Sequence, residues 1–289
     1  MAARIGRLDV IATPIGNLGD LSPRARDALA SADVIAAEDT RRTQQLLNAL
    51  GLSRPLMSLH THNEHASSAI LLKRLLGGDV VALVSDAGTP LLSDPGAQLV
   101  QRAVASGVAV HCLPGPSAIT AALAVAGVAA DRFCFEGFLP ARASARRDRI
   151  LMLAREPRSL VFFEAPHRIV EALEDLAAGF GQERNAAITR ELTKIHETVY
   201  RGSLGALLSR ARAESDIARG EITIVVAGHT SLVGEDSEAT QALLQRSLRV
   251  LLGELPPSRA AALAAQIAGV KRSDAYSLAQ KLTKMRQGE

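Results

Sequence analysis

The sequence has no tryptophan, and aromatic residues make up only 3% of its 289 positions. Its core must therefore be built from Ala, Val, Leu and Ile. A protein that binds RNA mainly by stacking many bases on aromatic rings is not expected. Only two cysteines occur, Cys112 and Cys134, which are too few for a disulfide framework or a cysteine-based metal site. Both lie in apolar, strand-like runs, so we predict buried, reduced thiols.

Long hydrophobic runs and nucleotide fingerprints are missing as well. No apolar run reaches the roughly 18 residues of a membrane-spanning helix, and the first residues lack a signal-peptide pattern. We therefore expect a cytoplasmic protein without membrane contact. Neither G-x-G-x-x-G nor G-x-x-x-x-G-K-[ST] occurs, which disfavours a Rossmann-type methyltransferase and a P-loop NTPase.

The overall composition is that of a globular protein. Hydrophobic residues make up 47% of the chain and charged residues 22%, which argues against disorder. The length suits two domains with a small appendage. A net charge of +3 permits a polyanionic partner without requiring one.

Short apolar runs alternate with helical patterns up to residue 117. Strands are predicted at Leu8–Ala12, Val34–Ala37, Leu56–Leu59, Val80–Val84 and Val108–Leu113, and helices near Pro23–Ala30, Thr43–Leu50, Glu64–Leu76 and Gly96–Ser106. Ser22 followed by Pro23 is a favourable helix start, because the hydroxyl caps a helix whose first position needs no amide donor. This alternation is typical of a mainly parallel sheet covered by helices.

The pattern changes beyond residue 117. Strands are predicted at Arg132–Glu136, Leu160–Glu164, Ala186–Arg190, Thr198–Arg201 and Ile222–Ala227. Helical patterns separate only some of them, so we expect a mixed sheet. We therefore divide the chain into α/β domains at 1–117 and 118–230 and a helical extension at 231–289. Gly228–Glu238 is predicted to be a linker. In the extension, Gly269 is predicted to end one helix and Ser273 to cap the next.

Three predicted strands end in loops rich in Pro, Gly and small residues. These loops are Thr13–Leu18, Ser85–Gly96 and Leu113–Ala118. Ligands in open α/β sheets bind outside the carboxyl ends of the strands, and glycine lets the backbone approach a ligand closely. The three loops therefore predict one shared small-molecule pocket.

Two of these loops, Thr13–Leu18 and the Ser85–Pro90 part of the second, occur in order with three further motifs: Ala37-Glu38-Asp39-Thr40-Arg41, Glu136-Gly137-Phe138-Leu139-Pro140 and Arg190-Glu191-Leu192-Thr193-Lys194. The ordered set, from about Leu8 to Met285, resembles the tetrapyrrole-methylase-like class of S-adenosylmethionine (SAM) methyltransferases. Within this class it is similar to bacterial enzymes that methylate a ribose 2′-oxygen of small-subunit ribosomal RNA.

The resemblance implies the two-domain α/β fold of the tetrapyrrole methylases, also called class III SAM methyltransferases, with a small C-terminal helical extension. It also implies a homodimer, SAM as cofactor, and a cytidine of the decoding centre as target, in small-subunit rRNA or in the 30S ribosomal subunit. Two alternatives remain open: a methyltransferase of a tetrapyrrole or another small molecule, and a non-catalytic nucleic-acid-binding protein. The basic C-terminal stretch argues against the first alternative, and the intact strand-end loops argue against the second.

SAM requires an oxygen that faces its sulfonium, backbone donors for its carboxylate and an apolar slot for its adenine. Asp86, Ala87 and Gly88 have the groups for the first two tasks, although the same residues also form ordinary turns. The cofactor-binding residues expected from the resemblance are Pro14, Gly16, Ser85, Asp86, Ala87, Gly88, Pro114, Ser117, Ala118, Ala165 and Thr223.

Two carboxylates follow the predicted strand Val34–Ala37 directly. A ribose 2′-hydroxyl is a poor nucleophile, so its methylation benefits from a positioned proton acceptor, for which Glu38 and Asp39 are candidates. The resemblance aligns Glu38 with an Asp proposed as the base in sirohaem-forming relatives. Arg41 and Arg42 are suited to hold phosphate, or all four side chains form a surface ion-pair cluster.

Lys194 is the third candidate catalytic residue. A cationic side chain lowers the cost of forming an alkoxide, although an ion pair between Lys194 and Glu191 or Glu197 is an equally good interpretation.

The spacing of three histidines is compatible with a metal site, but the rest of the sequence does not support one. His60, His62 and His65 have a spacing compatible with zinc. No cysteine lies near them and the resemblance implies no metal, so we expect none. A polar loop on the RNA side, or a helix start capped by Asn63, explains this segment better. A lone histidine such as His167 is more often structural than catalytic.

Two stretches are rich in cations. The first, from Arg142 to Arg158, carries Arg142, Arg146, Arg147, Arg149, Arg155 and Arg158. The second, from Pro257 to Glu289, carries Arg259, Lys271, Arg272, Lys281, Lys284 and Arg286. We select Arg146, Arg147, Lys271 and Arg272, with Arg41 and Arg42, as candidate RNA contacts. Solvated helix faces and a DNA-binding helix-turn-helix are the alternatives.

Overall fold

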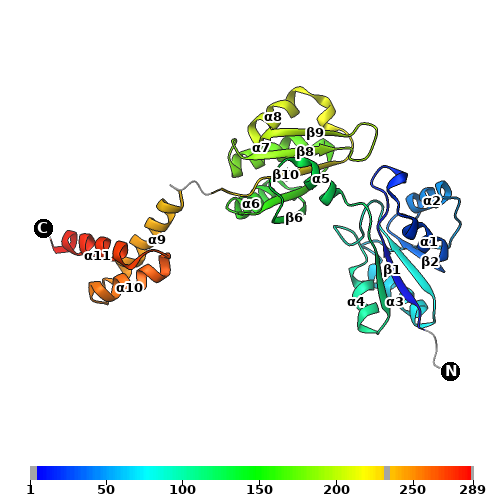
Figure 1. Ribbon diagram of the computed structural model, residues 1–289, viewed down its shortest axis with the longest axis horizontal. Helices are drawn as coiled ribbons and strands as arrows, with labels where there is room; N and C mark the ends of the chain where they lie inside the picture. Colours follow the sequence, from blue (N-terminus) through cyan, green and yellow to red (C-terminus); the bar gives the residue numbers. More distant parts are fainter. Residues whose placement is uncertain (1–4, 231–234, 288–289) are drawn as a thin grey trace. The chain divides into compact units, whose positions relative to one another are not determined.

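The computed structural model describes residues 5–230 and 235–287. The chain forms two compact units, Met1–His229 and Thr230–Glu289 (Figure 1). Among the described residues, no helix is both long and apolar enough to cross a membrane.

The first sheet has five parallel strands in the order β3-β2-β4-β1-β5. They are β1 (Arg7–Ile11), β2 (Val34–Ala37), β3 (Leu56–Ser58), β4 (Val80–Val84) and β5 (Ala109–Leu113). Its helices are α1 (Pro23–Ser31), α2 (Thr40–Ala49), α3 (Glu64–Leu76) and α4 (Ala97–Ala105), and a 3₁₀ turn, η1, spans Leu18–Asp20. The predicted parallel sheet is confirmed.

Helices cover both faces of this sheet. Along β4, Val81 and Leu83 pack with residues of α3 and α4, whereas Ala82 and Val84 pack with residues of α1 and α2. A strand buried on both faces reads as a continuous apolar run, which is why its limits were predictable. β5 lies at the sheet edge and its Cys112 is exposed, so the predicted burial of that thiol is wrong. Cys134 is only half-buried.

The helix starts agree only partly with the predicted caps. Ser22 Oγ accepts the amide hydrogen of Ala25 at 3.1 Å and Pro23 opens α1, as predicted. Asn63 stands at the cap position of α3 but makes no capping bond. Its side chain instead accepts the amide hydrogen of His60 and donates to the carbonyl of Ser58.

The second sheet is mixed, as predicted, with the order β6-β7-β10-β8-β9. β6 (Phe133–Phe138) runs parallel to β7 (Ser159–Glu164), and the remaining neighbours are antiparallel. The other strands are β8 (Asn185–Arg190), β9 (Thr198–Ser203) and β10 (Ile222–Val226). The helical elements are α5 (Ala118–Ala126), α6 (Ala143–Leu153), α7 (Ile169–Phe180), α8 (Leu204–Ala213), η2 (Pro166–Arg168) and η3 (Ser215–Ala218).

Strand alternation divides the residues of the second sheet between two cores. Phe162 and Ile224 point toward the core formed with α6, α7 and α8. Val161 and Val225 point the other way, toward the core formed with α5. α5 therefore packs on the second sheet, although it follows the last strand of the first. A division at residue 117 is in keeping with this packing and stays a prediction.

The C-terminal unit contains α9 (Glu235–Leu251), α10 (Pro257–Ala268) and α11 (Arg272–Gln287) around a small, alanine-rich core. Gly269 ends α10 with a φ of 67°, as predicted. Ser273 does not cap α11, because that helix already begins at Arg272 and the serine hydroxyl donates to Asp274. The predicted linker to Glu238 is too long, because α9 begins at Glu235; 231–234 lie outside the described residues.

We predict that Phe162→Ala lowers the free energy of unfolding by about 3–5 kcal/mol, because it empties a large buried site. The matched control is Phe133→Ala, at a ring that is 41% exposed on edge strand β6, which costs about 1 kcal/mol or less. Urea unfolding of both variants measures this difference. Equal losses at the two positions would contradict the described core.

Candidate active site

A cavity of about 400 Å³ lies between the strand-end loops of the first sheet and the α5 face of the second sheet. The loops after β1, β4 and β5 contribute Ile15, Asp86–Thr89, Leu92–Asp94 and Ser117–Ile119. The second sheet and its loops contribute Phe138, Phe163–Pro166, Thr189, Leu192 and Gly220–Thr223. The predicted shared pocket therefore exists, and the second sheet supplies about half of its wall.

The strand register of the second sheet brings together three residues of the pocket wall. Thr223 of β10 pairs with Phe163 of β7 on one side and with Thr189 of β8 on the other. All three line the pocket, because their side chains alternate with neighbours that point into the opposite core. The Thr189 hydroxyl donates to the Thr223 carbonyl at 3.2 Å, which satisfies a polar group inside this apolar wall.

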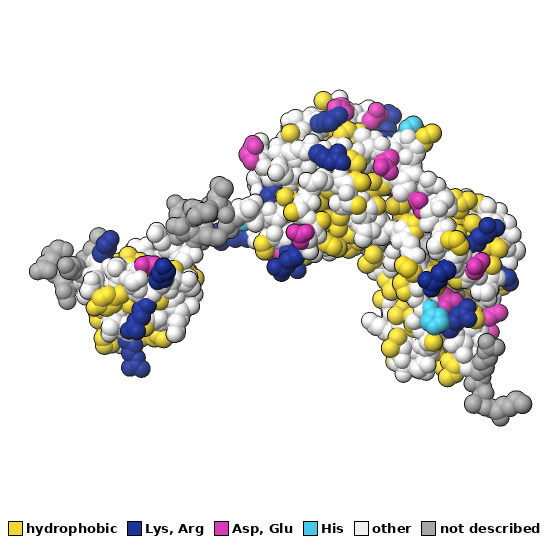
Figure 2. Space-filling model, in the orientation of Figure 1, with side chains coloured by type: hydrophobic (Ala, Val, Ile, Leu, Met, Phe, Trp, Pro, Cys, Tyr) yellow, Lys and Arg dark blue, Asp and Glu magenta, His cyan; other side chains and the backbone are white. Residues whose placement is uncertain are grey.

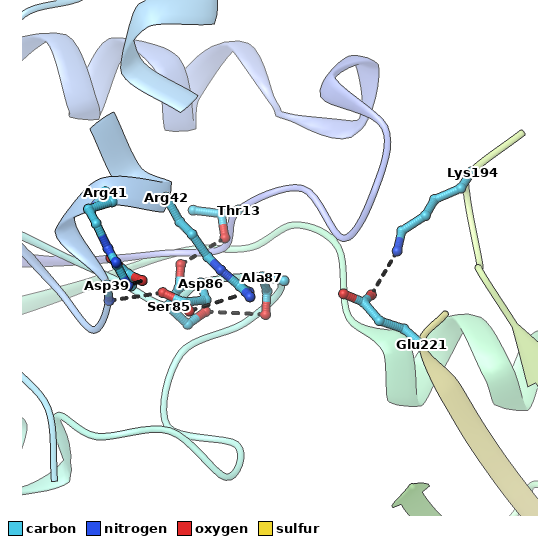
Figure 3. A network of polar contacts seen from close by, with 9 residues as sticks. All are labelled: Thr13, Asp39, Arg41, Arg42, Ser85, Asp86, Ala87, Lys194 and Glu221. Atoms are coloured by element: carbon cyan, nitrogen blue, oxygen red, sulfur yellow. Dashed lines mark hydrogen bonds and ion pairs between the residues drawn. The ribbon is translucent and has the colours of Figure 1, made fainter. Parts of the chain in front are cut away.

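Backbone hydrogen bonds join the loops after β1 and β4. The amides of Thr13 and Gly88 each donate to the other residue's carbonyl, at 2.9 and 3.0 Å. The Thr13 hydroxyl also donates to the Ser85 carbonyl (Figure 3). The Ser85 hydroxyl donates to the Gly88 carbonyl. Gly88 has a φ of 83°, and a Cβ there would lie 3.2 Å from Cγ2 of Ile15. A side chain at position 88 would therefore strain the loop.

Most of the cofactor-binding residues expected from the sequence line the pocket, namely Asp86, Ala87, Gly88, Ser117, Ala118, Ala165 and Thr223. Pro14, Gly16, Ser85 and Pro114 are not among its lining residues. The Ser85 hydroxyl instead donates to the Gly88 carbonyl and so stabilises the loop. Gly16 is covered by Lys194, whose Cγ lies 2.3 Å from where a Cβ on Gly16 would be.

Several lining residues were not predicted to contact the cofactor. Phe163 and Thr189 are strand residues, and their alternation with core residues marks the face they occupy. Leu192 lies in the Arg190–Lys194 motif, in which only Lys194 was assigned a role. Glu164 is buried as well, and it accepts the amide hydrogen of Ala165 at 2.8 Å.

Backbone strain is concentrated in the two loops that flank the pocket. Among the described residues, the non-glycine positions with positive φ are Leu91, Ser93, Glu191 and Thr193. Leu91 and Ser93 belong to the loop after β4, and Glu191 and Thr193 belong to the loop after β8. Such conformations persist only where the surrounding structure holds them, and they cluster at functional sites.

Asp39, the second predicted catalytic residue, forms a helix cap. Its Oδ1 accepts the amide hydrogen of Arg41 at 2.9 Å, and the Arg41 guanidinium contacts both carboxylate oxygens. These hydrogen bonds lower the pKa of Asp39 to about 2. Asp39 is therefore a poor proton acceptor near neutral pH.

The Asp86 carboxylate already has partners on the side that faces α2. It accepts the amide hydrogen of Asp39 at 3.0 Å, and its other oxygen lies 3.4 Å from Arg42 (Figure 3). Of the predicted ion-pair cluster of four side chains, only the pair of Asp39 and Arg41 forms, because Arg42 pairs with Asp86 instead. The side chains of Arg41 and Arg42 remain 87% and 62% exposed, so both guanidinium groups still reach solvent.

Glu38 and Asp94 differ from these paired carboxylates. Burial, followed by the charge of Asp86, raises the pKa of Glu38. Burial, followed by the charges of Glu38 and Asp86, raises the pKa of Asp94 to about 6. Asp94 lines the pocket, whereas Glu38 is not among the lining residues.

Lys194 forms two ion pairs at the edge of the pocket. Its Nζ lies 2.8 Å from Glu191 and 3.1 Å from Glu221 (Figure 3). Burial lowers the pKa of Lys194, but the hydrogen bonds to the two carboxylates outweigh it and the net shift is upward. The expected pair with Glu191 is confirmed, whereas Glu197 accepts the amide hydrogen of Thr193 instead.

The prediction that Arg146 contacts RNA is wrong, because its side chain is buried in ion pairs. Its residue is only 3% exposed, its Nε donates to Asp175 at 2.6 Å, and a second nitrogen donates to Glu171. A count of charges along the chain does not reveal this burial. Arg147 is 58% exposed, and Lys271 and Arg272 are exposed as well.

The histidines contribute nothing to the pocket lining. His167 is exposed, and His60 and His62 stack edge to face. Within residues 5–230 and 235–287, no cluster of His, Cys, Asp or Glu is arranged to hold a metal ion.

The two sheets and the pocket between them define an α/β methylase fold. Residues 7–208 match the family model for tetrapyrrole (corrin/porphyrin) methylases, and the chain belongs to this family. Residues 238–283 match a second model, the RsmI C-terminal HTH domain.

Named relatives match nearly the whole chain. It is 52% identical to the ribosomal RNA small subunit methyltransferase I of Xylella fastidiosa, over 94% of this chain and 98% of that protein. It is 48% identical to the protein of the same name from Pseudomonas aeruginosa, over 95% and 96%. Among solved structures, uroporphyrin-III C-methyl transferase from Thermus thermophilus, complexed with S-adenyl homocysteine, has a TM-score of 0.54 at 18% identity and covers 77% of this chain and 97% of its own.

We predict that Arg41→Met raises the pKa of Asp39 toward its ordinary value, because the methionine cannot donate to the carboxylate. In the parent protein this carboxylate stabilises the fold above its unfolded pKa near 4, and the stabilisation is lost as the pH falls through about 2. In the variant, the pKa difference between the folded and unfolded states narrows, so this pH-dependent stabilisation becomes smaller.

Carboxyl-resolved NMR titration measures the shift. Arg42→Met is the matched control, because that arginine pairs with Asp86. An unchanged Asp39 titration in Arg41→Met would refute the pairing.

Proposed function

We propose that this chain is a SAM-dependent methyltransferase that methylates the ribose 2′-oxygen of a cytidine in small-subunit rRNA, in the decoding centre. The observation that carries the proposal is the near full-length identity of 48–52% to relatives named ribosomal RNA small subunit methyltransferase I. Their match extends over the pocket loops and the C-terminal helices alike.

The pocket fits SAM, which supplies an electrophilic methyl group when bound. In the described part of the chain, the amides of Asp86 and Ala87 have no acceptor and are free to donate to its carboxylate. Ile119, Phe163 and Leu192 form an apolar wall suited to adenine. The Asp86 carboxylate already binds the Asp39 amide, so backbone carbonyls of this loop are the better partners for the sulfonium.

Of the two predicted catalytic carboxylates, Glu38 is the one whose pKa is raised. Its raised pKa reflects a carboxylate that binds protons more tightly than usual. Asp39 is excluded as a proton acceptor by its pairing with Arg41. Lys194 stays protonated and therefore acts only as a cation near the pocket edge.

RNA binding involves the C-terminal unit and the exposed arginines beside the pocket. Arg246, Arg249, Arg259, Lys271, Arg272 and Lys281 are exposed in the C-terminal unit, and no ion pair involves any of them within the described residues. Figure 2 shows Lys and Arg side chains on the visible face of this unit. Free cations of this kind bind phosphate, and we assign RNA contacts to them and, separately, to Arg41, Arg42 and Arg147 of the first unit.

The proposal includes a cytoplasmic homodimer that acts on rRNA within the 30S subunit. Incubation with labelled SAM and 30S subunits lacking the modification, followed by nuclease digestion and mass spectrometry, tests it. The expected product is one 2′-O-methylcytidine per subunit. A base-methylated product, or transfer to a tetrapyrrole but not to RNA, contradicts the proposed function. Light scattering of the purified protein tests the dimer.

We predict that Ala118→Leu weakens SAM binding at least about 10-fold, because the larger side chain occupies the pocket at the start of α5. Ala124→Leu is the control, since it lies on the same helix but is exposed and outside the pocket. Calorimetric titration with SAM measures both affinities. Equal affinity in the two variants would place the cofactor elsewhere.

We also predict that the double variant Lys271→Gln, Arg272→Gln weakens RNA binding and reduces the slope of log affinity against log salt by about 1 to 2, because fewer counterions are released. The charge-conserving variant Lys271→Arg, Arg272→Lys keeps the slope. SAM affinity stays unchanged in both. RNA titrations across a salt series measure the slope for each variant. If the glutamine variant has the same slope as the parent protein, these side chains do not bind phosphate.

A further inference from the structure

The Asp94 carboxylate belongs to the pocket but had no predicted role. It lies in the loop after β4 and lines the cavity beside Asp86 and Ser93. Among the described residues it forms no ion pair, whereas the nearby cations Arg41 and Arg42 are paired with Asp39 and Asp86. Asp94 is thus an un-neutralised carboxylate on the wall of the cavity.

Its loop is held in a strained conformation. Leu91 and Ser93 have φ angles of 75° and 72°, and Gly96 has a φ of 119°. A Cβ on Gly96 would lie 2.9 Å from Cδ2 of Leu83, so the loop ends tightly against the sheet core. A Cβ on Gly137 of β6 would lie 3.2 Å from the Ser93 hydroxyl, so the loop also contacts the second sheet. This geometry fixes the position of Asp94 in the wall.

The surroundings of Asp94 favour proton uptake near neutral pH. Burial is the main cause, and Glu38 after β2 and Asp86 after β4 add negative charge, while the Ser85 hydroxyl opposes them, so that the pKa is about 6. Arg42 and His60 act on this group through Glu38, whose pKa they lower. A general base works best when its pKa lies near the working pH.

We propose that Asp94 accepts the proton of the attacking hydroxyl and that Glu38 is a positioning residue that acts through its charge on Asp94. This inference rests on the proposed function. The ribose 2′-oxygen forms a bond to the methyl carbon, the carbon–sulfur bond breaks with its electron pair left on sulfur, and the hydroxyl proton passes to an Oδ of Asp94. The proton then leaves to solvent after the products dissociate.

Single-turnover methylation of 30S subunits at saturating SAM, from pH 5 to 9, tests the assignment. The parent rate should rise with pH with a midpoint near 6. Asp94→Asn should slow the step by about 100-fold or more and remove this midpoint, with SAM affinity unchanged. Glu38→Gln should keep most of the plateau rate and move the midpoint to lower pH, because a neighbouring negative charge is gone. Asp27→Asn, on the exposed face of α1, is the control for loss of one carboxylate.

Thermal unfolding checks that Asp94→Asn is folded. Because the native pKa is raised above the unfolded value, the charged carboxylate destabilises the parent above about pH 6 and has no effect below its unfolded pKa near 4. The variant should therefore melt higher than the parent at pH 8 and at the same temperature at pH 3.

Two results overturn the assignment. The first is a parental rate and midpoint in Asp94→Asn. The second is loss of both in Glu38→Gln with Asp94→Asn active, which makes Glu38 the acceptor. A parent protein that binds SAM but methylates no RNA contradicts the proposed function itself, and the proton acceptor with it.

Discussion

The backbone pair between Thr13 and Gly88 is the constraint on which the pocket depends. It ties the loops after two adjacent parallel strands, β1 and β4, by reciprocal hydrogen bonds of 2.9 and 3.0 Å. The glycine conformation at position 88 makes that pairing possible, and the hydroxyls of Thr13 and Ser85 satisfy the carbonyls around it. With both loops fixed, Asp86 and Ala87 line the cavity, and no described residue accepts a hydrogen bond from their amides.

Charged side chains around the pocket differ in whether they are paired. Asp39 and Asp86 are engaged by backbone amides and arginines, and Lys194 is held between Glu191 and Glu221. These pairs lower the pKa of Asp39 and Glu191 and raise the pKa of Lys194. Glu38 and Asp94 form no ion pair among the described residues, and burial raises the pKa of both carboxyl groups.

The sequence predicted the strands well because helices cover both faces of each sheet, so that buried strands become continuous apolar runs. The prediction of buried residues failed where exposure depends on the place of a strand within the sheet. Cys112 is exposed because β5 is an edge strand. That prediction also failed for Arg146, since burial depends on the acidic residues of α7, which are distant in sequence. Loop motifs identified the first-sheet half of the pocket. Thr189 and Phe163 were missed because their role follows from strand register alone.

The alternation along β10 makes the pocket sensitive to chain length. Thr223 faces the cavity while Ile224 faces the opposite core. Deletion of a single residue before Thr223 would invert the faces of the strand, placing a threonine hydroxyl in an apolar core and an isoleucine in the cavity. Evolution of this site can therefore proceed by substitution within the strands, whereas insertions and deletions are confined to loops away from it.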